Sequence, residues 1–218
     1  MNNPGYLIIG GGGHAAALAE ILIKQNKPLL GVIAPEILSG QAIFDTVQHY
    51  VQDNDVLKFS PEQALLVNGI GAMPGKTLRK KIYTRFTELG YTFATIVADS
   101  ALVSEYAVLA EGSQIMNNAV INIGSVIGEN TIVNTSVSID HDCIIGPHSH
   151  LAPGTTLSGA VKVENSVHIA TGASVINNVI IGANTVIGVG ANITKSIPSK
   201  SKVYGARSII KGLVKNES

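Results

Sequence analysis

Residues 119–145 read AVINIGSVIGENTIVNTSVSIDHDCII, and every sixth residue of this run, counted from Ile121, is a branched aliphatic one. The same register continues from Val103 to Ile193, and a small or short-branched residue stands two positions before each aliphatic residue. Helical stripes recur at three, four and seven residues, so a six-residue period excludes a helix. It predicts a left-handed parallel β-helix, in which each hexapeptide makes one strand and one corner. The aliphatic residues of successive coils then stack inward.

The composition limits the possible partners and the compartment of this 218-residue chain. Its formal net charge is zero, only 14% of its residues are charged, and it has no run of Lys or Arg. We therefore expect neither nucleic acid nor an anionic membrane as a partner. The single Cys143 cannot form an internal disulfide and is expected to pack at a corner. The N-terminus lacks the features of a signal peptide and no long apolar stretch occurs, so we expect a cytoplasmic protein.

The N-terminal segment predicts a strand, a glycine turn and a helix in direct succession. Residues 6–9 are apolar, residues 10–13 are all glycine, and an alanine-rich helix is expected over 15–25. This arrangement presents a helix N-terminus to a phosphate or another polar ligand group. Dinucleotide sites also need an acidic residue at the end of the second strand, where Ala34-Pro35 stands. We therefore expect a nucleotide-like ligand other than NAD.

The remaining N-terminal residues complete a small Rossmann-like α/β domain. Further strands are expected at 29–33, 64–70 and 91–97, with a short one at Val56-Leu57, and a helix at 76–89. The basic residues of that helix, Lys76, Arg79, Lys80 and Lys81, are expected to form a solvated face. Gly71 follows a strand, so it is expected to line the same crevice as Gly12 and Gly13. The predicted domains are residues 1–98, the β-helix at 99–198, and a C-terminal tail at 199–218.

Histidines and aspartates gather on the corners of the predicted solenoid between Asp140 and His150. His141 lies between two aspartates, which can fix its tautomer and raise its basicity, so it is the candidate general base. His150 is a second candidate because it lies close to His141, whereas His148 is expected in a solvated turn and His168 on a face without chemistry. A zinc site is the competing chemistry. The spacing of His141, His148 and His150 does not place three nitrogens on one edge of a coil.

Three features occur together: a glycine turn ending in Gly-His, the hexapeptide solenoid, and the run NTSVSIDHDCIIGPHSH at residues 134–150. This combination resembles the sialic-acid O-acetyltransferase-like sugar acyltransferases, most closely the UDP-4-amino-sugar N-acetyltransferases of bacillosamine biosynthesis. The resemblance implies a bacterial homotrimer with active sites at the subunit interfaces and no metal. It further implies transfer of the acetyl group of acetyl-CoA to the 4-amino group of a UDP-linked amino-dideoxy sugar for protein glycosylation.

The resemblance also assigns roles to individual residues. His141 matches the catalytic base, and Asp142 matches the acidic residue that increases its basicity. The cofactor positions are His150, Gly159, Thr171 and Val189, where Gly159 offers a backbone N–H to the thioester oxygen. The nucleotide-sugar positions are Gly12, Gly13, His14 and Gly71. The chain departs from the family at Ala34-Pro35, which replaces an acidic pair that holds the uridine, and at 205–208, which lacks a customary proline.

Two other functions are compatible with the same residues. A sugar or sialic acid O-acetyltransferase would use the same histidine on a hydroxyl group, so the sequence does not fix the acceptor, its stereochemistry or the glycan pathway. A non-enzymatic binding or scaffold solenoid would leave every activity unchanged in a His141→Ala variant. The residues on the corners from Asp140 to His150 are chemically diverse, whereas structural solenoids repeat one outward residue. This diversity favours an enzyme.

Overall fold

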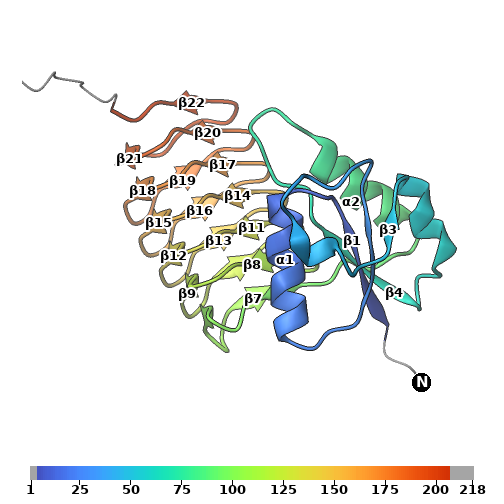
Figure 1. The fold of residues 1–218 in the computed structure, drawn as a ribbon. Helices are drawn as coiled ribbons and strands as arrows, with labels where there is room; N and C mark the ends of the chain where they lie inside the picture. The colour runs from blue at the N-terminus through green and yellow to red at the C-terminus, as the bar shows by residue number, and fades with distance from the viewer. Residues whose placement is uncertain (1–3, 207–218) are drawn as a thin grey trace, which may run out of the picture.

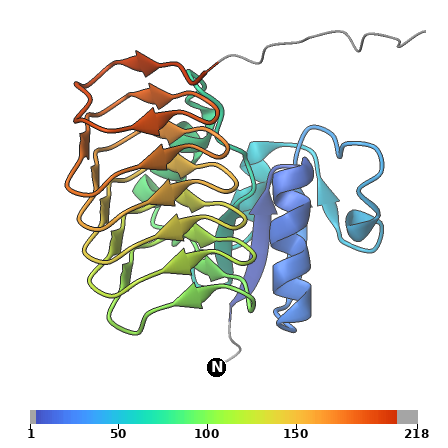
Figure 2. The same cartoon turned by 90° about the vertical axis from the view of Figure 1, so that its left-hand side faces the viewer.

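The computed structural model describes residues 4–206, in which an N-terminal α/β unit lies beside a parallel β-helix (Figure 1). The last part of the predicted C-terminal tail, residues 207–218, lies outside the described residues, as does half of the segment that lacks the family proline. Figure 2 shows the coils of the β-helix stacked one on another, with the sheet and α1 of the N-terminal unit against their side. The substrate and catalytic positions therefore belong to two units in contact.

The β-helix consists of three parallel sheets built from two-residue strands. One sheet contains β5 (Ile96–Val97), β8 (Gln114–Ile115), β11 (Ile132–Val133), β14 (His150–Leu151), β17 (His168–Ile169), β20 (Val186–Ile187) and β22 (Lys202–Val203). The second contains β6 (Leu102–Val103), β9 (Val120–Ile121), β12 (Ser138–Ile139), β15 (Thr156–Leu157), β18 (Ser174–Val175) and β21 (Asn192–Ile193). The third contains β7 (Val108–Leu109), β10 (Val126–Ile127), β13 (Ile144–Ile145), β16 (Lys162–Val163) and β19 (Ile180–Ile181). We call them the first, second and third sheets.

The strand register confirms the six-residue pattern. Ile127 pairs with Ile145, and Ile145 pairs with Val163, so a coil adds 18 residues. Among the described strands, only the final step from β20 to β22 is shorter, at 16 residues from Val186 to Lys202. The aliphatic residues of the pattern point inward, as the exposures of 0% for Ile127 and 1% for Ile145 show. The small residues of the pattern are buried with them, so both positions of the hexapeptide form the solenoid core. Stacking of these rows removes apolar surface from water along the whole length of the solenoid.

The corners of the solenoid bend through the left-handed region of the backbone. A positive φ recurs at every sixth residue from Gly112 to Gly190. Several of these positions carry side chains, among them Asp142 at 59° and His148 at 57°. Asp and Asn tolerate this conformation better than most residues with a side chain. The corner between the second and third sheets consequently projects His141 and Asp142 outward.

The N-terminal unit is a four-stranded parallel sheet in the order β3-β2-β1-β4, with a helix on each face. Its elements are β1 (Gly5–Ile9), α1 (Gly13–Lys24), β2 (Leu29–Ile33), a 3₁₀ helix (Ala42–Phe44), β3 (His49–Tyr50), a second 3₁₀ helix (Asp53–Lys58), β4 (Ala64–Asn68) and α2 (Leu78–Glu88). Residues of α1 pack with Ile8, Val32 and Val67 on one face, and residues of α2 pack with Leu7 and Leu66 on the other. The carboxyl ends of β1, β2 and β4 thus open at one edge, where such sheets bind ligands.

Two of the expected strands differ from the structure. The strand expected at Val56-Leu57 is wrong, because this segment forms the 3₁₀ helix Asp53–Lys58, whose start is capped by the Asp55 carboxylate accepting the Gln52 N–H at 3.0 Å. The segment expected to form one strand at 91–97 is divided. Phe93 bridges to Leu66 of the N-terminal sheet, whereas Ile96–Val97 already pair with β8 of the solenoid. Residues 93–97 therefore lead directly from the N-terminal sheet into the first sheet of the solenoid.

Candidate functional site

The corner after β12 holds the candidate catalytic pair. Nδ1 of His141 lies 2.8 Å from Oδ2 of Asp142, and the backbone N–H of His141 donates to Oδ1 of Asp140 at 2.8 Å. The carboxylate of Asp142 can only accept, so Nδ1 carries the proton and Nε2 keeps its lone pair. About half of the His141 side chain is exposed (55%). The structure therefore presents an oriented imidazole with a free basic nitrogen toward the outside of the solenoid.

The surrounding charges make His141 more basic than an ordinary histidine. Its pKa is raised above the usual 6.5, first by the hydrogen bond that it donates to the Asp142 carboxylate and then by the negative charge of Asp140. Asp140 is itself held by the backbone N–H of His141 and by Asn122, which keep the pKa of its carboxyl low. Both carboxylates thus favour a proton on His141, which suits a residue that takes one from a substrate.

Gly159 lies directly against the His141 ring, one coil further along the same corner. A Cβ placed on Gly159 would be 2.6 Å from both Nε2 and Cε1 of the imidazole. Within residues 4–206, the Gly159 N–H makes no backbone hydrogen bond. Of the predicted catalytic and cofactor residues, His141, Asp142 and Gly159 are therefore the ones that the chain itself brings together.

The other predicted cofactor residues lie elsewhere on the solenoid. His150 belongs to the first sheet, where its Nδ1 lies 3.0 Å from the Ala72 carbonyl oxygen and its Nε2 lies 3.2 Å from the Asn134 amide. Thr171 and Val189 occupy the corner between the first and second sheets, and both are exposed. His141 occupies the next corner, between the second and third sheets. One chain alone does not bring these residues to His141.

The predicted nucleotide-sugar residues lie at the carboxyl edge of the N-terminal sheet. A cleft of about 440 Å³ opens there beside the glycine turn, and its lining includes Gly12 but not the other three predicted residues. Its polar side chains are the carboxylates Glu36 and Asp53, and the rest of the lining is mostly apolar. Gly71 and His14 face each other next to this cleft, since a Cβ on Gly71 would lie 3.9 Å from that of His14.

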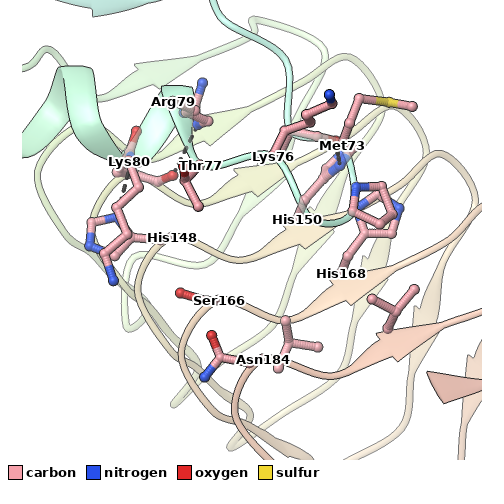
Figure 3. A pocket seen from close by; sticks show the side chains of 16 residues that line it. Met73, Lys76, Thr77, Arg79, Lys80, His148, His150, Ser166, His168 and Asn184 are labelled. Atoms are coloured by element: carbon pink, nitrogen blue, oxygen red, sulfur yellow. Dashed lines mark hydrogen bonds between the residues drawn. The ribbon is translucent and has the colours of Figure 1, made fainter. Parts of the chain in front are cut away.

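A second cavity, of about 260 Å³, separates the segment 72–80 from the first sheet of the solenoid (Figure 3). Lys76 and Lys80 approach it from α2 and the preceding loop, and His148, His150 and His168 approach it from the solenoid. Burial lowers the pKa of His148 to about 4 and that of His150 to about 3, so both are neutral at pH 7. The expectation that His148 is solvated is wrong, because the ring packs on Tyr83 and only 11% of its side chain is exposed.

A buried polar cluster joins the two units behind these cavities. Its members are Asn68, Arg79, Gln114 and Asn130, and none is more than 6% exposed. The prediction of a solvated basic face therefore holds for Lys76, Lys80 and Lys81 but is wrong for Arg79, whose guanidinium turns toward the solenoid. The sequence gives no sign of this cluster, since its members are far apart in the chain and none belongs to a recognised motif.

The described residues contain neither a metal cluster nor a membrane span. In residues 4–206, no three His, Cys, Asp or Glu side chains are grouped as metal ligands would be. Over the same range, no helix has the length and apolar character needed to cross a membrane.

Comparison with known proteins places the chain in a family. Residues 124–159 match the model of the bacterial transferase hexapeptide (six repeats). The acyl-[acyl-carrier-protein]–UDP-N-acetylglucosamine O-acyltransferase of Helicobacter pylori is 32% identical over 77 residues, which are 35% of this chain and 28% of that protein. The chain spans only about a third of the length of the curated relatives that it matches.

Several solved structures match over nearly their whole length, among them the following two. The crystal structure of PerB from Caulobacter crescentus, in complex with CoA and GDP-perosamine, is 31% identical with a TM-score of 0.80, and the match covers 95% of this chain and 97% of that one. The acetyltransferase domain of PglB from Neisseria gonorrhoeae, in complex with acetyl coenzyme A, is 28% identical with a TM-score of 0.84 and coverages of 94% and 97%. From the hexapeptide match, the full-length likeness to these acetyltransferases and the stacked parallel coils, we conclude that the chain belongs to the hexapeptide-repeat transferases and has the fold of their acetyltransferase members, a left-handed β-helix.

Proposed function

We propose that the protein is a sugar N-acetyltransferase that moves the acetyl group of acetyl-CoA to the 4-amino group of a nucleotide-linked amino-dideoxy sugar. The observation that carries this proposal is the oriented imidazole of His141, with Nδ1 on Asp142 and Nε2 free beside Gly159. The full-length likeness to a protein solved with CoA and GDP-perosamine supports both substrate classes. His141 and Asp142 form the catalytic pair of this proposal.

The proposed chemistry is a direct attack on the thioester. The amine nitrogen forms a bond to the acetyl carbonyl carbon while Nε2 of His141 takes a proton from the nitrogen. When the carbon–sulfur bond breaks, the CoA sulfur leaves as a thiolate and receives that proton from His141, so the products are the amide and free CoA. A positioned general base of this kind contributes about 100- to 10,000-fold. No covalent acetyl-enzyme is required, and buried Cys143 is unsuited to form one because burial raises its pKa.

The backbone N–H of Gly159 is the proposed donor to the thioester oxygen. It lies beside the base and has no backbone partner in the described residues, so it is available to the oxygen on which negative charge develops. Donors to a developing oxyanion contribute about 100- to 1,000-fold in other enzymes. The glycine thus has two functions in this proposal, because it also leaves room for the ring.

A homotrimer with active sites between subunits completes the proposed site. His141 lies on one corner of the solenoid, Thr171 and Val189 lie on another, and His150 lies on the face of the first sheet. In the proposed assembly, the His141 corner of one copy faces His150, Thr171 and Val189 of its neighbour, and acetyl-CoA binds in the groove between them. The exposure of His141, Thr171 and Val189 supports this arrangement.

The N-terminal unit is proposed to bind the nucleotide sugar. Gly12 is the N-cap and Gly13 the first residue of α1, and the free N–H groups of this first turn suit a diphosphate. The cleft beside them is wide enough for a base and ribose, and Glu36 and Asp53 can accept their N–H or O–H groups. His14 and Gly71 lie between this cleft and the solenoid, so they would contact the sugar.

The test of the function is CoA release from acetyl-CoA with a panel of acceptors. The panel contains a UDP-4-amino-4,6-dideoxy sugar, a GDP-linked 4-amino-4,6-dideoxy sugar and free sialic acid. We expect rapid release with the UDP-amino sugar, as in the bacillosamine-type enzymes that the sequence resembles. If the enzyme preferred the GDP-linked sugar, as the likeness to PerB would favour, the proposed nucleotide would be GDP in place of UDP, and the proposed reaction would stay the same. Release with sialic acid alone would replace amine by hydroxyl, and no release with any acceptor would contradict the proposal.

The pH dependence tests the role of Asp142. Because the carboxylate raises the pKa of His141, the base loses its proton only above the ordinary imidazole value of 6.5. We expect kcat/KM to rise with pH through this raised pKa. In Asp142→Asn, the pKa falls, so the rise should move to lower pH while the plateau drops, because the imidazole is a weaker base. The measurement is kcat/KM of both enzymes on one acceptor between about pH 5 and pH 9. The substrate amine titrates in the same way in both profiles, so it cannot cause a difference between them. A rise at the same pH in both enzymes would refute this role of Asp142.

A further inference from the structure

The buried cluster at the junction of the two units converges on one side-chain amide, that of Gln114. The Oε1 atom of Gln114 accepts from Nη2 of Arg79 at 3.1 Å, and its Nε2 donates to the Asn68 carbonyl oxygen at 2.9 Å. Nε2 of His14 approaches the same Oε1 to 2.8 Å. Gln114 is fully buried and comes from β8 of the solenoid, whereas Asn68, Arg79 and His14 come from the N-terminal unit.

Arg79 determines which way this amide points. Its Nη1 donates to the carbonyl oxygens of Asn68 at 2.7 Å and of Ile70 at 2.8 Å, which fixes the guanidinium behind the end of β4. A guanidinium can only donate, and a carbonyl oxygen can only accept. If the amide were reversed, its NH₂ group would face Arg79 and its oxygen would face the Asn68 carbonyl, and both contacts would be repulsive. The oxygen of Gln114 is therefore held toward His14.

The fixed oxygen in turn selects one tautomer of His14. An oxygen acceptor at 2.8 Å requires a proton on Nε2, so Nδ1 of a neutral ring is left with its lone pair. The ring is neutral at physiological pH, because burial and then the charge of Arg79 lower its pKa to about 4. In the described residues, Nδ1 has no hydrogen-bond partner. His14 thus presents a single acceptor nitrogen next to the glycine turn.

We propose that Arg79 and Gln114 are positioning residues for the acceptor sugar, which hold His14 in the tautomer whose free Nδ1 accepts a hydrogen bond from a hydroxyl or amino group of that sugar. The assignment of a sugar to His14 rests on the proposed function, whereas the tautomer does not. His14 lies opposite Gly71, between the nucleotide cleft and the solenoid. A donor-bearing sugar that extends from the cleft toward the solenoid would meet this nitrogen.

The charge of Arg79 supports the same conclusion. In the described residues, its hydrogen-bond partners are backbone carbonyls and the Gln114 amide, and no carboxylate neutralises it. Burial is the main cause that lowers the pKa of His14, His148 and His150, and the positive charge of Arg79 adds to it in each case. Three imidazoles around the cluster therefore remain neutral. Neutral imidazoles can accept hydrogen bonds from the sugar. They add no positive charge to the region in which the substrate amine must lose its proton.

The tautomer is tested first, in the wild-type protein, by long-range ¹H–¹⁵N NMR of histidine side chains. The His14 signals are assigned by their loss in a His14→Gln variant. We expect the pattern of a neutral ring protonated on Nε2, unchanged between about pH 6 and pH 8. A ring protonated on Nδ1, or a charged ring, would overturn the proposal without any reference to substrate.

The positioning role is tested by Gln114→Met, which keeps the length of the side chain and removes both polar atoms. We expect mixed His14 tautomers, a rise of about 5- to 10-fold in KM for the nucleotide sugar, and a KM for acetyl-CoA changed by less than about twofold. The matched control is Gln25→Met. Gln25 also joins the two units, through the Val97 carbonyl oxygen at 2.8 Å, but lies at the opposite end of α1.

The outcomes separate the inference from the proposed function. Equal effects of the two methionine variants on both KM values would show that Gln114 only holds the units together, and would overturn the positioning role. An unchanged tautomer and unchanged KM in Gln114→Met would also overturn it. If the wild-type tautomer is the expected one but no nucleotide sugar is acetylated, the proposed function and the acceptor role of His14 fail, and only the coupling of Arg79, Gln114 and His14 remains.

Discussion

Replacement of His141 by alanine is expected to lower kcat by more than about 100-fold, with little change in the KM for either substrate. The imidazole lies on an exposed corner and supports no part of the core, so its removal eliminates the base without opening a cavity. Among residues 4–206, its only side-chain hydrogen-bond partner is the exposed carboxylate of Asp142. We therefore expect the melting temperature to stay within a few degrees of the wild type.

Steady-state kinetics on the best acceptor of the panel, with calorimetric melting, measure both effects. Glu105→Ala is the matched control, because Glu105 is exposed at the same corner position two coils earlier. Its activity should equal that of the wild type. If His141→Ala retained more than a tenth of the wild-type kcat, the general-base role would be wrong, and the scaffold interpretation would regain support.

Gly159→Ala is expected to lower kcat by about 100-fold although it adds one methyl group. The new Cβ would lie 2.6 Å from Nε2 and Cε1 of His141, well inside van der Waals contact, so the ring must rotate away from its bond with Asp142. The φ angle of Gly159 is not in the left-handed region, so alanine meets no backbone strain there. The loss should therefore come from displacement of the base and not from unfolding.

A double-mutant cycle separates this explanation from general damage to the corner. In the His141→Ala background there is no ring to displace, so adding Gly159→Ala should lower kcat little further. Additive losses would mean that the added methyl group acts independently of His141, for example by obstructing acetyl-CoA. The cycle requires a measurable residual rate in His141→Ala. Stopped assays that quantify the acetylated sugar are suited to such slow rates.

The sequence was sufficient for the solenoid because its signal is local and repeated. Every coil repeats the same pair of inward positions, from Ala119 and Ile121 to Ala191 and Ile193. The prediction therefore rests on many repeats, and a chance match at one position does not affect it. The pair His141 and Asp142 was predictable for a similar reason, since adjacent residues at a corner must lie close together. The glycine turn after β1 was recognised because strand, turn and helix follow one another directly.

The residues that the sequence did not reveal are those whose environment comes from distant parts of the chain. Arg79 follows the basic pattern of an exposed helix face, yet it is 6% exposed because α2 packs against the solenoid at this point. Gln114 occupies the outward position of its strand, which is usually solvated, and is buried only because the N-terminal unit covers this sheet. The prediction of a strand at Val56-Leu57 was wrong because two adjacent apolar residues favour a strand less strongly than the cap between Gln52 and Asp55 favours the 3₁₀ helix.

The step of 18 residues between paired strands, which holds from β5 to β21, also constrains how such a chain can evolve. Duplication of one whole coil beyond β15 would lengthen the molecule by one strand spacing, about 4.8 Å, and would leave His141 in place relative to the α/β unit. Duplication of a single hexapeptide would instead transfer every later residue to the next face, and Thr171 and Val189 would leave their corner. Descendants of this fold can therefore gain or lose length in complete turns, while shorter insertions survive only as loops at the corners.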